Sequence, residues 1–239
     1  MPLYYEAVQG YSPLISGVAL FPDTFTVAPL AVVTGIVITV TGHYRWAVWG
    51  GWALTVLGTG ILVVLKVDTT IPAWIFLTMV SGVGLGMLFP SMQYSLQAAT
   101  TNKDMGFAVA MFSFFRTFGQ AIGVAIGGAI FQNEMVKKLK AYPHFAPQAR
   151  ELAKDAAALV QIIKETPEGP TKLDLRTAYV DSVRVIFIVL CALSAVALVS
   201  SLFIKSYDLN RALETEQGFV EVKKSKENVA EQGAHAGES

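Results

Sequence analysis

The stretch from Met111 to Phe131, MFSFFRTFGQAIGVAIGGAIF, is apolar at almost every position and carries one charged residue, Arg116. A run of about 20 apolar residues is long enough to cross the hydrocarbon core of a bilayer as a helix. An arginine stays charged at any ordinary pH, and placing it at membrane depth costs about 2.5–3.5 kcal/mol on insertion scales. The stretch therefore predicts a membrane-spanning helix whose arginine faces the protein interior or a cavity.

The composition of the whole chain agrees with a membrane protein. Of its 239 residues, 53% are hydrophobic and only 15% are charged, whereas soluble domains carry about 25% charged residues. The mean hydropathy is +0.50. Basic and acidic residues balance at 18 each, so no net positive field favours nucleic acid as a partner. The partner that the composition indicates is membrane lipid.

Five stretches are long and apolar enough to cross a bilayer: residues 14–40, 46–65, 71–98, 105–131 and 185–204. They are too long for strands, and none alternates as a barrel strand does. Helices satisfy every backbone polar group within the segment, as lipid requires. The predicted fold class is an all-α membrane protein.

The chain divides into five parts by composition. We expect the stub of a preceding helix and a loop at 1–13, four helices joined by short polar turns over 14–132, and a loop at 133–182. This loop should contain an amphipathic helix that lies on the membrane surface or over the mouth of the bundle. A last transmembrane helix follows at 183–204, and a disordered tail at 205–239. The lysines near the end of this tail, Lys223, Lys224 and Lys226, are either solvated or in contact with anionic lipid. The expected total is five spans and part of a sixth.

Residues with metal-binding or catalytic patterns are missing from the sequence. The three histidines, His43, His144 and His235, lie far apart, and Cys191 has no second cysteine to pair with. No HExxH, GxSxG or phosphate-loop motif occurs. We therefore expect no metal, no cofactor and no enzymatic activity.

Asp23 and Arg116 are the charged residues that fall well inside apolar spans. Asp23 lies between Pro22 and Pro29, which free backbone carbonyls and suit a segment that lines a cavity. It either takes part in transport or lies in a vestibule without a specific role. Arg116 is either a structural residue bonded to carbonyls or an acid, or a residue that binds substrate. Both charges lie about ten residues into their spans, about 15 Å deep at 1.5 Å per residue, so a pair between them is one expectation.

Small residues recur at helical spacing in two of the spans. The positions expected to allow close helix packing are Gly82, Gly84, Gly86 and Pro90 in the third span, and Gly119, Gly123 and Gly127 in the fourth. Polar residues accompany them, and those expected to line a substrate or coupling path, together with Asp23 and Arg116, are Gln93, Tyr94, Gln97 and Gln120. Glycine-rich membrane helices also occur as plain packing helices, so these patterns leave both interpretations open.

Four segments together resemble a known family. YYEAVQGYSPLISGVALFP, TGIVITVTGHYRW, SGVGLGMLFPSMQYSLQAA and MFSFFRTFGQAIGVAIGGAIFQN, in this order, resemble the C-terminal part of fungal major facilitator superfamily transporters, in particular the fourteen-helix drug:proton antiporters. The resemblance implies efflux of small hydrophobic compounds or fungal secondary metabolites and toxins by proton antiport. It also implies a plasma, vacuolar or vesicle membrane and a cytoplasmic tail at 205–239, which makes the loop at 133–182 extracellular. Arg116 stands where this family recurrently has an arginine, whereas Asp23 matches no family pattern known to us.

The chain also departs from the family pattern. A full member has fourteen helices in two bundles with substrate between them, so we expect a truncated gene model, a remnant or one piece of a split gene. Transport would then need the missing N-terminal bundle or a partner chain. The alternatives are a non-transporting fragment that regulates or scaffolds another membrane protein, and, least favoured, a membrane enzyme. Charge alone leaves the orientation open, because lysines and arginines flank the spans on both sides.

Overall fold

The computed structural model describes residues 1–67, 69–205 and 207, and every regular element in these residues is helical. Five long helices form the body: α3 (Phe21–Thr41), α4 (Arg45–Leu62), α5 (Ile71–Ala99), α6 (Met105–Leu139) and α9 (Pro170–Leu202). The shorter elements are α1 (Pro2–Ala7), α2 (Pro13–Val18), α7 (Ala149–Leu152), α8 (Ala156–Glu165) and the 3₁₀ turns η1 (Asn102–Asp104) and η2 (Ala146–Gln148). The predicted tail lies mostly outside the described residues, as do Lys223, Lys224 and Lys226.

Four segments in the described part of the chain are long and apolar enough to cross a membrane: Pro13–Thr41, α5, α6 and α9. The all-α membrane fold predicted from the sequence is thus confirmed. The first of these segments is α2 followed by α3, with a turn at Ala19 and Leu20 between them. The span predicted at 46–65 falls on α4, which is not among the four. Glycines and an arginine lower its apolar content, and α4 packs between α5 and α9.

Two helices extend beyond the predicted spans. α6 continues to Leu139 and α9 already begins at Pro170, so the connection between them is much shorter than the predicted loop at 133–182. At 33 residues, α9 is about 50 Å long, which exceeds a hydrocarbon core of about 30 Å. The extra turns are polar on one side, and on the other they bury Met135, Leu139 and Tyr179 against each other.

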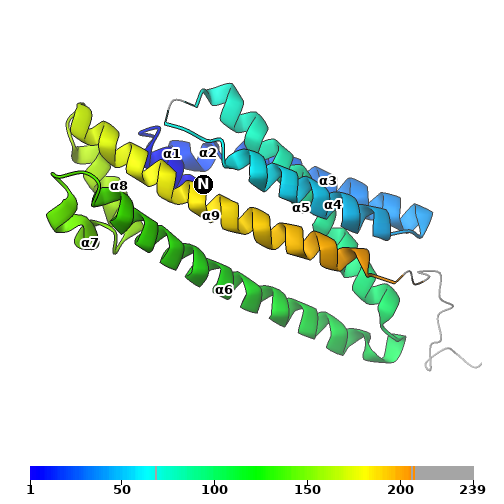
Figure 1. Cartoon of the computed structure of the whole chain (residues 1–239). Coiled ribbons are helices and arrows are strands. Elements are labelled where there is room, and N and C mark those ends of the chain that lie inside the picture. The colour runs from blue at the N-terminus through cyan, green and yellow to red at the C-terminus, as the bar shows by residue number, and fades with distance from the viewer. Residues whose placement is uncertain (68, 206, 208–239) are drawn as a thin grey trace, which may run out of the picture.

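A small cap formed by α1, α7, α8 and the first turns of α9 covers one end of the long helices (Figure 1). The predicted amphipathic helix is α8, and its apolar side chains Leu159, Val160 and Ile163 are buried. They pack in the cap core with α1 and α9, so this face is not free to lie on a membrane surface. A partly buried ion pair of 2.8 Å between Lys164 and Glu6 connects α8 to α1.

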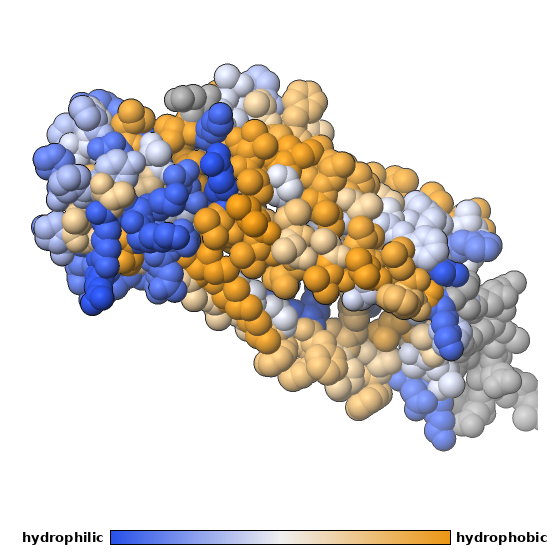
Figure 2. All heavy atoms as spheres, in the orientation of Figure 1, coloured by the Kyte–Doolittle hydropathy of each residue, from blue (hydrophilic) through white to orange (hydrophobic). Residues whose placement is uncertain are grey.

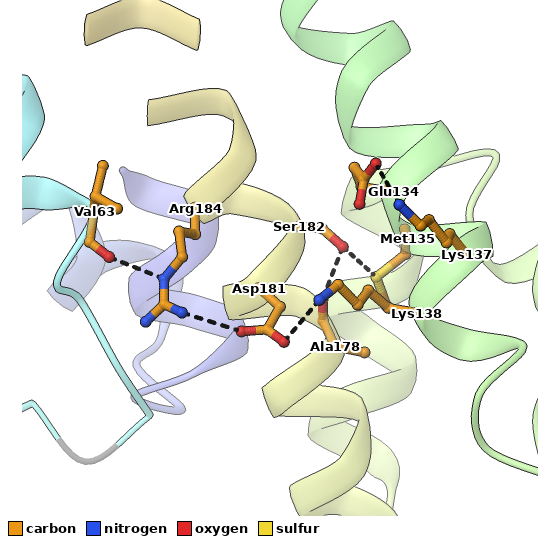
Figure 3. A network of polar contacts seen from close by, with 9 residues as sticks. All are labelled: Val63, Glu134, Met135, Lys137, Lys138, Ala178, Asp181, Ser182 and Arg184. Atoms are coloured by element: carbon orange, nitrogen blue, oxygen red, sulfur yellow. Dashed lines mark hydrogen bonds and ion pairs between the residues drawn. The ribbon is translucent and has the colours of Figure 1, made fainter. Parts of the chain in front are cut away.

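A network centred on Asp181 connects the cap end of three segments (Figure 3). Its carboxylate accepts a 3.1 Å hydrogen bond from Lys138 of α6 and lies 3.9 Å from Arg184. Arg184 in turn donates to the carbonyl of Val63, just after α4, at 2.9 Å. Asp181 therefore ties α6 and α9 to the end of α4 where hydrophobic packing gives way to water.

The surface shows where the bilayer would lie. In the view of Figure 2, hydrophilic residues gather over the cap and at the opposite end, with a hydrophobic band between them. The α3–α4 and α5–α6 turns and the end of α9 lie together at the end away from the cap (Figure 1). Tyr44 joins two of these segments by donating a 3.0 Å hydrogen bond to the carbonyl of Lys205.

Glycines of α4 and α5 allow backbones to approach closely. A Cβ atom on Gly84 would lie 2.6 Å from the backbone nitrogen of Thr55 in α4, and one on Gly58 would lie 2.6 Å from Cα of Ser81 in α5. On the other side of α5, a Cβ on Gly86 would lie 2.8 Å from the carbonyl oxygen of Val27 in α3. α5 is therefore the central helix, in contact with α3 and α4 through positions that accept no side chain.

The glycines of α6 differ from those of α5. A Cβ on Gly119, Gly123 or Gly127 would meet no atom of the described residues within 4 Å. The predicted packing ridge thus has no partner helix in the described part of this chain. The reason is that α6 packs against α9 through its C-terminal turns, where Phe131, Met135 and Leu139 are its buried residues.

The two sets of glycines provide a matched test. We expect Gly84→Ala to destabilise the folded chain by about 1–3 kcal/mol, because the new methyl group meets backbone that no side-chain rotation can move. Gly127→Ala makes the same chemical change in another membrane helix, where the methyl group has open space. Thermal unfolding of the purified chain in detergent measures both. Equal melting temperatures for the two variants would contradict the close α4–α5 contact.

Candidate functional site

A cavity with a volume of about 930 Å³ lies among the long helices. This volume is at the upper end of the range for small-molecule pockets, about 300–1,000 Å³. The lining is mainly apolar and aromatic, and its large side chains are Leu20, Val27, Trp52, Leu62, Leu85, Leu88, Phe89, Met92, Phe112, Phe115, Phe187 and Leu190. We call it the main cavity. Figure 2 shows hydrophilic atoms deep in a hollow of the hydrophobic band.

Hydroxyl groups of α4 and α5 supply part of the polar lining. Thr55 donates to the carbonyl of Gly51 at 2.8 Å, Thr59 to that of Thr55 at 2.7 Å, and Thr78 to that of Trp74 at 3.0 Å. Because each proton is directed into the helix backbone, these oxygens present lone pairs toward the cavity. They can accept hydrogen bonds from a ligand, but they do not offer donors to an anion.

Asp23 lines the main cavity from the first turn of α3. The turn at Ala19 and Leu20 ends α2, and Pro22 sits in the first turn of α3, where a missing N–H costs nothing. Asp23 lies at the helix end whose dipole favours a negative charge. Its Oδ1 atom is packed against α5, because a Cβ on Gly82 would lie 2.9 Å from it. A carboxyl group thus reaches the cavity at a break in a membrane helix.

Arg116 lines the same cavity from α6. Its guanidinium carbon lies 4.3 Å from the ring centroid of Phe89 in α5, which is a cation–π contact. Among the residues that the structure describes, the Arg116 side chain makes this contact and no hydrogen bond or ion pair. The five N–H donors of this side chain are available to whatever occupies the cavity.

The pair expected between Asp23 and Arg116 does not form in this structure, although both residues line one cavity. Asp23 is level with Gly82 of α5, whereas Arg116 is level with Phe89. Seven residues of helix separate these levels, which is about 10 Å along the axis. The expectation failed because it counted residues from the ends of straight spans. The turn before α3 and the inclined course of α5 in Figure 1 make such counting unreliable.

The other predicted polar residues lie away from the main cavity. Tyr94 shares a 2.9 Å hydrogen bond with Thr39 of α3 and borders a second cavity of about 370 Å³ beside Gly35 and Pro90. The three glutamines, Gln93, Gln97 and Gln120, line neither of these two cavities. Of the six residues proposed for a substrate or coupling path, the structure brings Asp23 and Arg116 together in one cavity.

The aromatic lining was missed by the sequence analysis, although one signal was present. Phe112 lies one turn before Arg116 on the same face of α6, Phe115 directly precedes Arg116, and all three side chains line the cavity. The predicted face ran from Arg116 toward the glycines and did not include the preceding turn. Trp52 and Phe187 come from α4 and α9, and no spacing in the sequence relates them to α6.

We expect the effects of Asp23→Asn and Arg116→Gln on the stability of the folded chain to be additive within about 0.5 kcal/mol, as for groups without a direct interaction. Each single variant and the double variant are compared by thermal unfolding in one detergent. If the double variant recovers stability lost by the single ones, the two charges interact and the separation described above is wrong.

Comparison with known proteins identifies the family. Residues 1–134 match the Major Facilitator Superfamily. The chain is 54% identical over 235 residues to MFS transporter L2 of Phoma sp., and the match covers 98% of this chain and 39% of that protein. It is 30% identical over 240 residues to the MFS-type efflux pump LUC4 of Fusarium sp., covering 98% of this chain and 42% of that protein. Efflux pump FUS6 of Gibberella moniliformis is 29% identical over 240 residues, with 96% and 41% covered.

The chain spans about two fifths of the length of these relatives. No solved structure matches it. The relatives are named as transporters and efflux pumps, not as enzymes, in agreement with the expectation from the sequence. The matched family and the apolar helices together show that this chain belongs to the major facilitator superfamily and is an integral membrane protein.

Proposed function

We propose that this chain forms one wall of the pathway of an efflux transporter that exports small hydrophobic compounds by proton antiport. The observation that carries the proposal is the main cavity, which is apolar, large enough for a drug-sized molecule and holds two ionisable side chains at membrane depth. Relatives named as efflux pumps support the direction of transport.

Asp23 is the coupling residue in this proposal. A carboxyl group can exist with or without a proton. An arginine cannot take this role, since it does not lose its proton in proteins. Asp23 would bind a proton when the cavity faces one side of the membrane and release it when the cavity faces the other side. The charge of the cavity would therefore differ between the two states.

The other wall would come from a complementary set of helices, in the same polypeptide or in a partner chain. The open glycine ridge of α6 favours this arrangement, because small residues allow another helix to approach closely. We place the protein in the plasma membrane with the cap outside and residues from Lys205 onward in the cytoplasm. Vacuolar and vesicle membranes are the alternatives, with the tail still cytoplasmic.

A chimera tests the transport function. In MFS transporter L2 of Phoma sp., this chain would replace the segment to which it is 54% identical. We expect yeast cells carrying the chimera to expel the fluorescent hydrophobic compounds that control cells carrying unchanged L2 are found to expel, and an uncoupler to stop the process. L2 lacking the segment, and this chain expressed alone, should expel none, because the cavity needs both walls.

Two variants of the chimera test the coupling. Asp23→Asn should remove most of the uncoupler-sensitive efflux, since an amide cannot carry the proton. Asp104→Asn is the matched control, because Asp104 is exposed in the α5–α6 turn and bonds to Thr101 at 2.7 Å. A chimera that reaches the membrane at the level of L2 and expels nothing would contradict the proposed function.

Single cysteines test the orientation. In a Cys191→Ala background, we expect Ala157→Cys in the cap to react with an impermeant maleimide on intact cells. His43→Cys, in the exposed α3–α4 turn, should react after the cells are permeabilised. Labelling of His43→Cys alone on intact cells would reverse the proposed orientation.

A further inference from the structure

Arg116 contributes a permanent positive charge to the main cavity, and the described residues supply no anion to balance it. The acidic residue that shares the cavity, Asp23, lies about 10 Å away along α5 at seven residues of 1.5 Å each. The ion pairs elsewhere in the described chain involve residues of the cap and the adjoining turns of α6 and α9. A charge at this depth is costly unless something compensates it.

The contact with Phe89 compensates only part of this cost. The face of a phenylalanine ring attracts a cation, but it has no oxygen or nitrogen atom to accept from the guanidinium. The contact does hold the side chain toward α5 and the cavity. The contact leaves the N–H donors of the planar, fork-shaped guanidinium group free, and two of them can donate parallel hydrogen bonds to one carboxylate.

Asp23 and Arg116, the ionisable side chains that line the cavity, differ in a way that determines which ligand charge it favours. Arg116 stays positive at every ordinary pH, whereas the carboxyl group of Asp23 can be neutralised by a proton. The fixed charge of the cavity is therefore positive. The hydroxyl groups of Thr55 and Thr78 already donate to helix carbonyls, so Arg116 is the group suited to receive an anion.

We propose that the main cavity binds amphiphilic carboxylates, with the carboxylate on Arg116 and the apolar body among the aromatic side chains. This inference rests on the proposed transport function for its biological meaning and narrows the substrate class to organic acids with a large apolar part. Phe112, one turn before Arg116 on α6, and the adjacent Phe115 line the cavity, and Trp52 lines it from α4. If the apolar part of the ligand extends along α5 toward Asp23, it would meet the threonine hydroxyl oxygens of the cavity, which accept hydrogen bonds.

The test uses three probes of one shape and different charge. They are 4-(4-nitrophenyl)butanoate, the corresponding butanol and the corresponding butylammonium ion. A nitrophenyl ring quenches tryptophan fluorescence on contact, and Trp52 lines the cavity. The whole chain is placed in phosphatidylcholine nanodiscs, and the dissociation constant of each probe is measured by quenching. Empty nanodiscs correct for partition into lipid, and Trp52→Phe identifies the quenching that arises in the cavity.

We expect the carboxylate to bind about 10-fold to 100-fold more tightly than the alcohol, the range for hydrogen bonds that involve charged groups. Arg116→Gln should abolish this preference, and Arg116→Lys should keep part of it, because lysine retains the charge and loses the fork. Gln120→Leu is the matched control on α6, since Gln120 is exposed one turn later and does not line the cavity. It should leave the preference unchanged.

Three results would overturn the inference. The first is equal affinity for carboxylate and alcohol in the unchanged chain, which needs no variant to fold. The second is a preference that survives Arg116→Gln. The third is loss of carboxylate binding in nanodiscs that contain phosphatidylserine, which would assign Arg116 to an anionic lipid headgroup. The binding test and the transport test can fail independently. The chain can show an Arg116-dependent preference for the carboxylate even if the chimera expels nothing. The chimera can also expel neutral compounds even if the chain shows no such preference.

Discussion

The close contact of α5 with α3 and α4 is the constraint on which the rest of the structure depends. Hydrophobic burial contributes little to helix association in lipid, so backbone approach and dispersion become decisive. Gly84 faces α4 and Gly86 faces α3, each at a distance that a Cβ atom would violate. With glycines on those faces, α5 presents its large side chains to the remaining side, where Leu85 and Phe89 line the main cavity. Packing and binding surfaces are thus divided around one helix.

The same arrangement separates the two ionisable groups. Gly82 leaves space for the carboxylate of Asp23 beside α5, and Phe89, two turns later, receives the guanidinium of Arg116. If the charges met, they would neutralise each other and leave the cavity apolar. Held apart, each remains available to a ligand or a proton. The cost of two separated charges at membrane depth is a reason to look for their role in function.

Much of the fold could be predicted from the sequence because few kinds of backbone structure can span a lipid bilayer. The length of the apolar stretch alone located the C-terminal end of α5 to within one residue. The glycines of α5 and the two charges within the spans could be recognised from residue type alone. The rest required tertiary information. α6 and α9 extend beyond the predicted spans because their additional, partly polar turns pack with the cap. A prediction based on apolar stretches cannot detect such turns. The level of Asp23 relative to Arg116 depends on the turn before α3 and on how α5 crosses its neighbours. The aromatic lining joins Trp52 of α4 with Phe187 of α9, which lie 135 positions apart in the sequence.

The limited burial of α6 shows how hydrophobicity and packing separate in a membrane protein. None of its most apolar stretch is buried in the described chain, and a soluble protein with such a surface would aggregate. In lipid the apolar residues need no partner, so exposure of phenylalanines such as Phe107 and Phe118 carries no information. The glycines differ, because a bare backbone gains nothing from lipid contact, and glycine lowers helix stability by about 1 kcal/mol relative to alanine. The open row of glycines on α6 is therefore the feature of this helix that supports the proposed second wall, and Arg116, which lines the cavity, lies one turn before the row begins.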